Sequence, residues 1–258
     1  MHPILFKAGS FTVYSYGFFI ALGAFIGLAY MGWQGKKTYR LSIDKTNSLF
    51  IFIVVAAVVG GKAFLFFENP SLYLSNPARF FSGRGFVFYG SFLFAVPTML
   101  WFFKRNNIPT LGMLDIMAIV TCLVHGFGRI GCFMAGCCHG TPTDLFWGIT
   151  FTSPICQAEP LNAPLYPTQL LESGFIFIVM IFLLFLKKQR SFDGQLFLLY
   201  LMLYAIGRSF LEFLRGDSGR GFVGDGLLSN SQVIVLLIIP IAGYYYAKFN
   251  RRSKLLKK

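Results

Sequence analysis

The chain has 258 residues and a net charge of +13, and 55% of its residues are hydrophobic while only 13% are charged. A soluble domain carries about 25% charged residues, so these side chains are too few to cover a water-facing surface. The composition excludes an ordinary soluble protein and predicts an integral membrane protein. Because the basic residues flank apolar runs, we expect no nucleic-acid partner.

Seven apolar runs follow one another along the chain. Each is close to the length of about 20 residues that a helix needs to cross a bilayer, and continuous runs favour helices over the alternating strands of a β-barrel. The first run is too long for a signal-peptide core, so we expect it to be retained as a span. The sequence predicts an all-α integral membrane protein with about seven transmembrane helices, at residues 14–33, 49–67, 85–103, 112–128, 169–186, 194–213 and 232–249.

The connectors between these runs differ in their content of Lys and Arg. Those after the first, third, fifth and seventh runs are the more basic, and basic connectors stay in the cytoplasm. This asymmetry predicts an outer N-terminus and a cytoplasmic C-terminus. On the opposite connectors we count five basic residues, Lys7, Arg79, Arg84, Arg215 and Arg220, with Arg129 treated as the end of the fourth run. We expect residues 1–258 to form a single polytopic membrane domain, in which the longest polar connector, 129–168, is an outer, periplasmic-side excursion.

Charged residues inside apolar runs cost about 2.5–3.5 kcal/mol each on insertion scales and therefore indicate function. In the sixth run, Tyr204, Arg208 and Glu212 recur every four residues and share one helical face. Arg208 and Glu212 form either a structural salt bridge or part of a functional site. Other charges within or beside such runs are Lys62, Arg129 and Glu172.

The segment HGFGRIGCFMAGCCHG (125–140) ends the fourth run and opens the excursion. Arg129 follows a long uncharged stretch, with His125 one helical turn before it. Glycines let the backbone turn and approach a ligand closely, and a guanidinium binds phosphate through two parallel hydrogen bonds. The pattern indicates a site for a phospholipid headgroup, and the alternative is an interfacial arginine paired with surface lipid.

Cys132, Cys137, Cys138 and His139 place four soft metal ligands close together in this segment. Structural zinc sites usually use two well-separated ligand pairs, and three adjacent residues fit a tetrahedron poorly. The other interpretations are a disulfide from Cys132 to Cys137 or Cys138, and small, partly apolar loop residues. We expect no stoichiometric metal.

These segments resemble the bacterial prolipoprotein diacylglyceryl transferases. The stretch HGFGRIGCFMAGCCHGTPTDLFWGITF (125–151) is similar to the signature region of that family. Further segments similar to the family's motifs occur in the family's order: VYSYGFFIALG, GGKAFLFFENP, GFVFYGSF, LYPTQLLES, YAIGRSFLEFLR and SNSQVIVLLIIP. The resemblance implies a seven-helix protein of the bacterial inner membrane with a periplasmic head.

The resemblance also implies transfer of the diacylglyceryl group of phosphatidylglycerol to the lipobox cysteine thiol of a preprolipoprotein. A thioether forms and glycerol phosphate leaves. The implied partners are phosphatidylglycerol, preprolipoprotein signal peptides and the lipid bilayer, with no cofactor. The expected catalytic residues are Arg129, Arg208, Tyr89 and His125, and the expected substrate-binding residues are Tyr16, Gly140, Tyr204 and Glu212.

The chain departs from the better-known family members in two places. Tyr89 stands where they have a histidine, and a tyrosine with an ordinary pKa near 10 is a poor base at neutral pH. His125, His139 and Glu212 are then the other candidates for a proton acceptor. After the signature arginine, those members have asparagines and a glutamate where this chain has Cys132, Ala135 and Cys137.

Three alternative functions follow from the same residues. The first is a metal-dependent or thiol-redox membrane enzyme that uses Cys132, Cys137, Cys138 and His139. The second is a paralogue that acts on another thiol acceptor. The third is a transporter that uses the Arg208–Glu212 pair, although the sequence shows no repeated halves of the kind expected for it.

Overall fold

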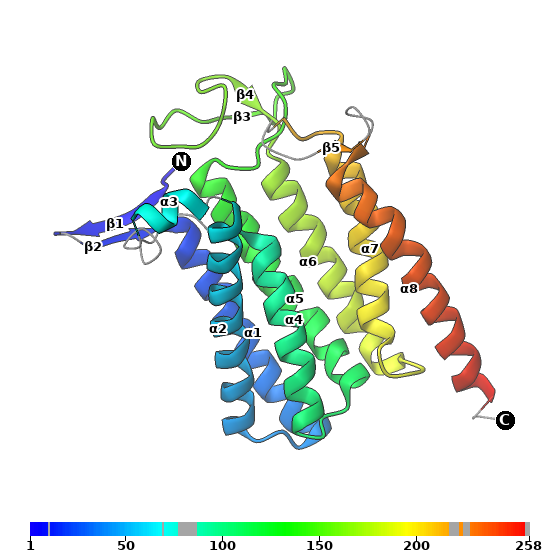
Figure 1. Cartoon of the computed structure of the whole chain (residues 1–258). Helices are drawn as coiled ribbons and strands as arrows, with labels where there is room; N and C mark the ends of the chain where they lie inside the picture. Colours follow the sequence, from blue (N-terminus) through cyan, green and yellow to red (C-terminus); the bar gives the residue numbers. More distant parts are fainter. Residues whose placement is uncertain (10, 69, 77–86, 217–221, 224–227, 256–258) are drawn as a thin grey trace. The chain divides into compact units, whose positions relative to one another are not determined.

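The computed structural model describes the whole chain except residues 10, 69, 77–86, 217–221, 224–227 and 256–258. Helices dominate the described part (Figure 1). They are α1 (Ser15–Tyr39), α2 (Ile43–Glu68), α3 (Pro70–Ser75), α4 (Phe88–Arg105), α5 (Thr110–Ala135), α6 (Thr168–Leu186), η2 (Lys187–Gln189, a 3-10 turn), α7 (Gln195–Glu212) and α8 (Asn230–Leu255). The chain divides into two compact units, Met1–Tyr30 with Leu114–Lys258, and Met31–Met113.

Each of the seven predicted runs overlaps one of these helices, and residues 85–86 of the third run lie outside the described residues. Among the described residues, five helices are long and apolar enough to cross a membrane, namely α1, α2, α5, α6 with η2, and α8. The prediction of a helical, multi-pass membrane protein is therefore confirmed. The helices α4 and α7 have 18 residues each.

Two features differ from the expected elements. The fourth run was expected to end at residue 128, but α5 continues to Ala135, so Arg129 and Cys132 lie on a helix and not in a loop. Short antiparallel hairpins also accompany the helices, because strands of two to five residues give no periodic sequence signal. They are β1 (Ile4–Ala8) with β2 (Phe11–Tyr14), β3 (Ile149–Thr150) with β4 (Pro164–Leu165), and β5 (Phe222–Val223) with β6 (Leu228–Ser229).

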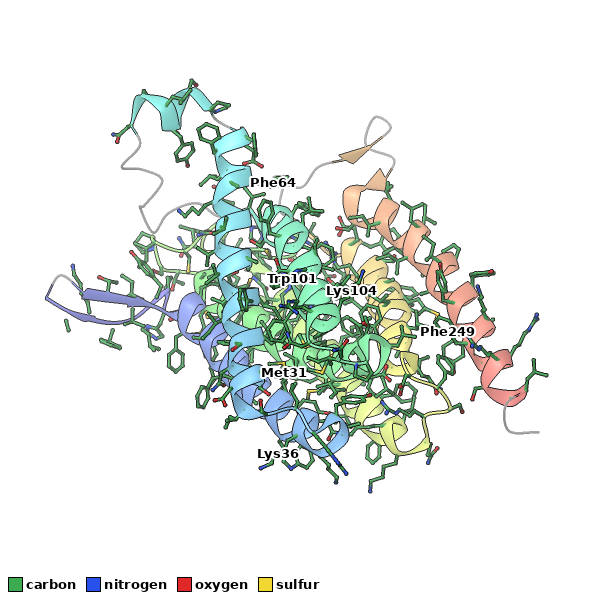
Figure 2. All side chains as sticks on the ribbon, turned by 60° about the horizontal axis from the view of Figure 1, so that its bottom comes forward. Met31, Lys36, Phe64, Trp101, Lys104 and Phe249 are labelled. Carbon is green, nitrogen blue, oxygen red and sulfur yellow. The ribbon has the colours of Figure 1, made fainter. Side chains whose placement is uncertain are left out.

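In the unit Met31–Met113, α2 and α4 cross at two glycines. A Cβ atom on Gly60 would lie 2.3 Å from the carbonyl oxygen of Gly90, and one on Gly90 would lie 2.4 Å from that of Gly60. Phe64 of α2 covers the same point (Figure 2). Lys36 and Lys104 lie in the last turns of α1 and α4, where cations favour the helix dipole.

In the other unit, the first half of α1 packs with α5, and α6, α7 and α8 lie side by side (Figure 1). Glycines again allow close approach, since Gly126 of α5 faces the ring of Phe177 and Gly207 of α7 faces the ring of Phe175. The buried core between these helices consists of Ala118, Ile119, Cys122, Ile176, Val179, Leu183, Leu196 and Tyr200.

Asp115, which the sequence analysis did not single out, joins α5 to the start of α7. Its carboxylate is 1% exposed and accepts hydrogen bonds from the backbone N–H groups of Gly194, at 2.9 Å, and Phe197, at 3.0 Å. Arg190 lies 3.2 Å from the same carboxylate. Asp115 thus serves as a cap for a helix that has no capping side chain of its own.

The segment between α5 and α6 is ordered without being helical. Phe151, Ala158 and Leu165 form a small buried cluster within it, and Leu165 also bridges Pro142. Because α5 ends and α6 begins at this segment, its packing positions the helix ends that carry the candidate site.

Candidate active site

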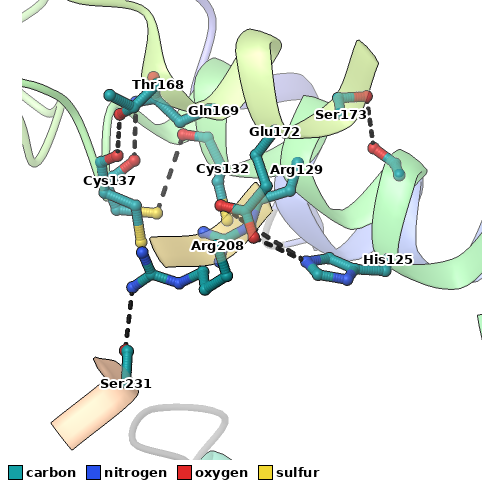
Figure 3. A network of polar contacts seen from close by, with 12 residues as sticks. His125, Arg129, Cys132, Cys137, Thr168, Gln169, Glu172, Ser173, Arg208 and Ser231 are labelled. Atoms are coloured by element: carbon teal, nitrogen blue, oxygen red, sulfur yellow. Dashed lines mark hydrogen bonds and ion pairs between the residues drawn. The ribbon is translucent and has the colours of Figure 1, made fainter. Parts of the chain in front are cut away.

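A buried carboxylate on α6 gathers polar side chains from three helices. The side chain of Glu172 is 3% exposed, and its oxygens lie 3.2 Å from Nε2 of His125 and 3.1 Å from Nε of Arg129. Tyr204 of α7 donates its hydroxyl hydrogen to the same carboxylate at 3.3 Å. Figure 3 shows the carboxylate beside His125 and Arg129.

The local fold explains why these groups meet. His125 and Arg129 are four residues apart on α5 and therefore share one face, and their side chains are 3.4 Å apart. This arrangement requires α5 to continue past Gly128, as it does. Ser173, next to Glu172, donates a hydrogen bond of 2.9 Å to the carbonyl oxygen of Gly126 and ties α6 to α5 at this level (Figure 3).

Arg208 is held separately on α7. Its Nη1 lies 2.5 Å from Glu212, one turn further along the helix, and its Nη2 donates to the hydroxyl of Ser231 on α8 at 3.1 Å. Arg208 also interacts electrostatically with Glu172 and Tyr204. Arg129 therefore contacts Glu172 directly, whereas Arg208 pairs with Glu212 and acts on Glu172 only through the longer-range attraction of its charge.

A cluster of thiols lies one turn beyond Arg129. The Sγ atoms of Cys132, Cys137 and Cys138 all lie within 4.8 Å of one another, and the three cysteines are free. His139 does not join them, because its Nδ1 donates to the carbonyl oxygen of Gly140 at 3.0 Å and its Nε2 accepts the N–H of Glu159 at 3.2 Å. Of the four candidate metal ligands in this segment, the structure therefore brings together only the three thiols, while His139 bonds to other groups.

Hydrogen bonds among the thiols make them electrostatically unequal. Those from Cys132 and Cys137 lower the pKa of Cys138, and the charges of Arg129 and Arg215 lower it further. Hydrogen bonds with Cys132 and Cys138 raise the pKa of Cys137.

The remaining predicted residues lie in different surroundings. Tyr16, at the start of α1, packs against Gly131 of α5, where a Cβ atom would lie 3.1 Å from the Tyr16 Cα. Gly140 is a packing junction, since its Cβ would lie 2.4 Å from Cβ of Tyr166. Tyr89 belongs to the other compact unit, on α4, and is about half exposed.

Sequence reasoning recognised Glu172 as an unusual charge but gave it no role. The available signal was a glutamate in an otherwise apolar run, which requires a buried partner. His125 and Arg129, spaced for one helical face, were the natural partners. Ser231, the α8 partner of Arg208, gave no comparable signal.

Known proteins resemble this chain over nearly its whole length. Residues 3–247 match the family described as prolipoprotein diacylglyceryl transferase. The chain is 36% identical over 256 residues to the phosphatidylglycerol–prolipoprotein diacylglyceryl transferase of Clostridium tetani, which covers 98% of this chain and 100% of that protein. It is 35% identical to the second such transferase of Clostridium perfringens, over 97% of this chain and 96% of that protein. A transferase of the same name from Dehalococcoides mccartyi is 30% identical, over 98% and 95%. With nearly its whole length matched in this way, the chain belongs to the prolipoprotein diacylglyceryl transferase family.

Proposed function

We propose that this protein transfers the diacylglyceryl group of phosphatidylglycerol to the lipobox cysteine thiol of a preprolipoprotein. The thiolate sulfur attacks a glycerol carbon of the lipid, a carbon–sulfur bond forms, and the bond from that carbon to the phosphate oxygen breaks. The products are a thioether and glycerol phosphate, and the thiol proton passes to an acceptor in the site or to water.

The observation that carries the proposal is a pair of buried arginines on α5 and α7: Arg129 contacts Glu172, and Arg208, paired with Glu212, adds its charge to the same site. A guanidinium suits a phosphate because its planar fork makes two parallel hydrogen bonds. Negative charge grows on the departing phosphate, and donors already in place in a site with little water stabilise it. Arg129 and Arg208 supply that stabilisation, and Glu172 holds Arg129 in position before lipid arrives.

His125 is the proposed proton acceptor. It contacts Glu172 at 3.2 Å and lies edge-on to the ring of Tyr204, with ring centroids 5.1 Å apart. A free thiol has a pKa near 8.5, so little activation is needed at neutral pH. Four further residues are proposed to shape the substrate site: Tyr16, Gly140, Tyr204 and Glu212. Tyr89 is proposed to orient the substrate or to donate a hydrogen to it.

The proposal includes an arrangement in the membrane. The helices α4 and α7 cross with the five long helices, which makes seven spans of one polytopic domain in the bacterial inner membrane. A helix of 18 residues is about 27 Å long, close to the hydrocarbon thickness of about 30 Å. The N-terminus and residues 129–168 then face the periplasm, where signal peptides of preprolipoproteins arrive.

The names of the relatives do not favour a metal-dependent or thiol-redox enzyme. A direct assay separates the possibilities: the purified protein in proteoliposomes is given phosphatidylglycerol with a labelled diacylglyceryl group and a lipobox peptide. Label is expected on the peptide, and a peptide with serine in place of the cysteine is expected to receive none. Absence of label on the cysteine peptide would exclude the proposed reaction.

A further inference from the structure

The three thiols beside Arg129 are arranged as ligands. Zinc–sulfur bonds are about 2.3 Å long, so sulfurs on one tetrahedron lie about 3.8 Å apart. The Sγ atoms of Cys132, Cys137 and Cys138 already lie within 4.8 Å of one another. The largest separation therefore exceeds the tetrahedral one by no more than about 1 Å.

The backbone explains how neighbouring cysteines point to one place. Cys138 has a φ of 59°, in the left-handed region that a residue with a side chain rarely adopts, and Gly136 has a φ of 81°. This turn brings two adjacent sulfurs toward Cys132 at the end of α5. The objection that adjacent ligands fit a tetrahedron poorly applies to a regular backbone and not to this one.

Hydrogen bonds hold the loop in that shape. Thr168 donates to the carbonyl oxygen of Cys138 and Gln169 to that of Cys137, both at 2.8 Å (Figure 3). The N–H of Gly136 donates to the carbonyl oxygen of Cys132 at 2.9 Å. Because α6 provides Thr168 and Gln169, the ligand positions are set by the same helices that carry the candidate active site.

We infer that Cys132, Cys137 and Cys138 form a binding site for one thiophilic metal ion of the Zn²⁺ class, held by three sulfurs. Soft thiolate ligands select zinc and copper(I) over the hard cations. The fourth position of the ion is filled by water or another ligand from outside the chain. The metal site is separate from the proposed transfer reaction. Metal binding can therefore be measured without assaying transfer.

Binding at this site couples the end of α5 to the loop that follows it. Cys132 lies three residues from Arg129 on one helix, whereas the other two ligands lie beyond the helix. An ion that binds the folded protein stabilises it in proportion to the logarithm of its concentration over its Kd. Zinc is therefore expected to raise the Tm of the protein in detergent.

The test uses full-length protein, purified in detergent, fully reduced and stripped of metal with a chelator. ZnCl₂ alone is added, excess ion is removed, and zinc per chain is measured by mass spectrometry with Kd from chelator competition. One zinc per chain is expected. Cys132→Ser, Cys137→Ser and Cys138→Ser should each raise the Kd at least about 100-fold, since even outer-shell changes cost 10–100-fold.

Cys156→Ser and Cys122→Ser are the matched controls, because these free cysteines lie outside the cluster and should leave the Kd unchanged. A measurement without variants completes the test: zinc should protect the three cluster thiols of the wild type from maleimide and leave Cys156 reactive. Less than about one zinc per five chains, equal losses in the controls, or no selective protection would each overturn the inference. Since transfer activity is assayed separately, failure here leaves the proposed reaction standing.

Discussion

Glu172 and its partners offset the free-energy cost of burying charged groups in this protein. A buried ion is several kcal/mol less stable than in water unless it is paired, and removal of one partner leaves the other uncompensated. Glu172 pairs with Arg129 and accepts from Tyr204, so its two oxygens are used by groups on α5 and α7. The carboxylate therefore holds the guanidinium in the place where a phosphate is expected to bind.

Glu172→Gln tests that role. The amide keeps the shape of the side chain but removes the charge that orients Arg129, and misplacement of a catalytic group by about 1 Å can cost 100-fold in rate. We expect kcat/KM for transfer to fall about 100-fold while the protein still elutes as a folded species in detergent. Glu159→Gln, an exposed glutamate in the α5–α6 segment, is the control and should transfer normally. Equal activity of the two variants would contradict the role of Glu172.

At the scale of elements, glycine sets how closely the helices approach. The segments that resemble the family's second-span and third-span motifs meet at the Gly60–Gly90 crossing, where backbone contacts backbone. Small residues allow such close packing in membranes, where helix association depends on van der Waals contact rather than on the hydrophobic effect. These glycines therefore have a packing role that the motif resemblance did not reveal.

Gly60→Ala and Gly90→Ala should destabilise the α2–α4 pair. Either Cβ would lie less than 2.5 Å from a carbonyl oxygen, and overpacking of this kind costs about 1–3 kcal/mol. The measurement is Tm in detergent, which should fall in both variants. Gly243→Ala on α8 is the control, since its Cβ meets nothing within 4 Å and alanine favours the helix. A Tm unchanged in the first two variants would show that the crossing is not this close.

The Asp115 cap makes a second prediction for an element. Asp115→Ala removes the acceptor of two backbone N–H groups at the start of α7, and hydrogen bonds to a charged group contribute about 1.5–3 kcal/mol. A fall in Tm is expected, with α7 losing protection from hydrogen exchange at its first turn. Asp193→Ala, which removes only the exposed partner of Arg190, should change stability by about 0.5 kcal/mol or less. A similar small effect for Asp115→Ala would contradict the capping role.

The elements show where sequence reasoning succeeded and where it failed. Each of the seven predicted runs overlaps a helix of the described residues, because a long apolar run favours helix in lipid, whereas the short α3 (Pro70–Ser75) was not predicted. The end of α5 was misplaced, because glycines and Arg129 were read as a loop although helix continues through them to Ala135. His125 and Arg129 could be paired from their spacing, and a lone glutamate in an apolar run indicated that Glu172 needs a buried partner, but their contact depends on how α6 packs against α5.

At the scale of the whole molecule, the distribution of basic residues predicts the direction in which each helix crosses. Fusions of green fluorescent protein and of alkaline phosphatase after Arg105, after Ser153 and at the C-terminus test this prediction. Fluorescence is expected after Arg105 and at the C-terminus, and phosphatase activity after Ser153. If α7 did not cross, the C-terminal fusion would instead report the outer side; if α4 did not cross, the Ser153 fusion would report the cytoplasm.

Function at this scale required both motif order and packing. The family could be recognised from segments spread along the chain, whereas the contact of Arg129 with Glu172 and the charge effect of Arg208 on it required the packing of α5, α6 and α7. The spacing of Arg208 with Tyr204 and Glu212 was enough to assign it to a polar helix face. Its hydrogen bond to Ser231 of α8 could not be predicted, because the two residues are 23 positions apart in the sequence.

The most direct test is a double-mutant cycle on the two arginines in the labelled transfer assay. Arg129→Lys and Arg208→Lys keep the charge but lose the fork, and each is expected to lower kcat/KM at least about 100-fold. If both guanidinium groups act on one phosphate, the double variant will lose less than the product of the two single losses. Near-normal transfer by either single variant, or strictly multiplicative losses, would contradict a shared phosphate site.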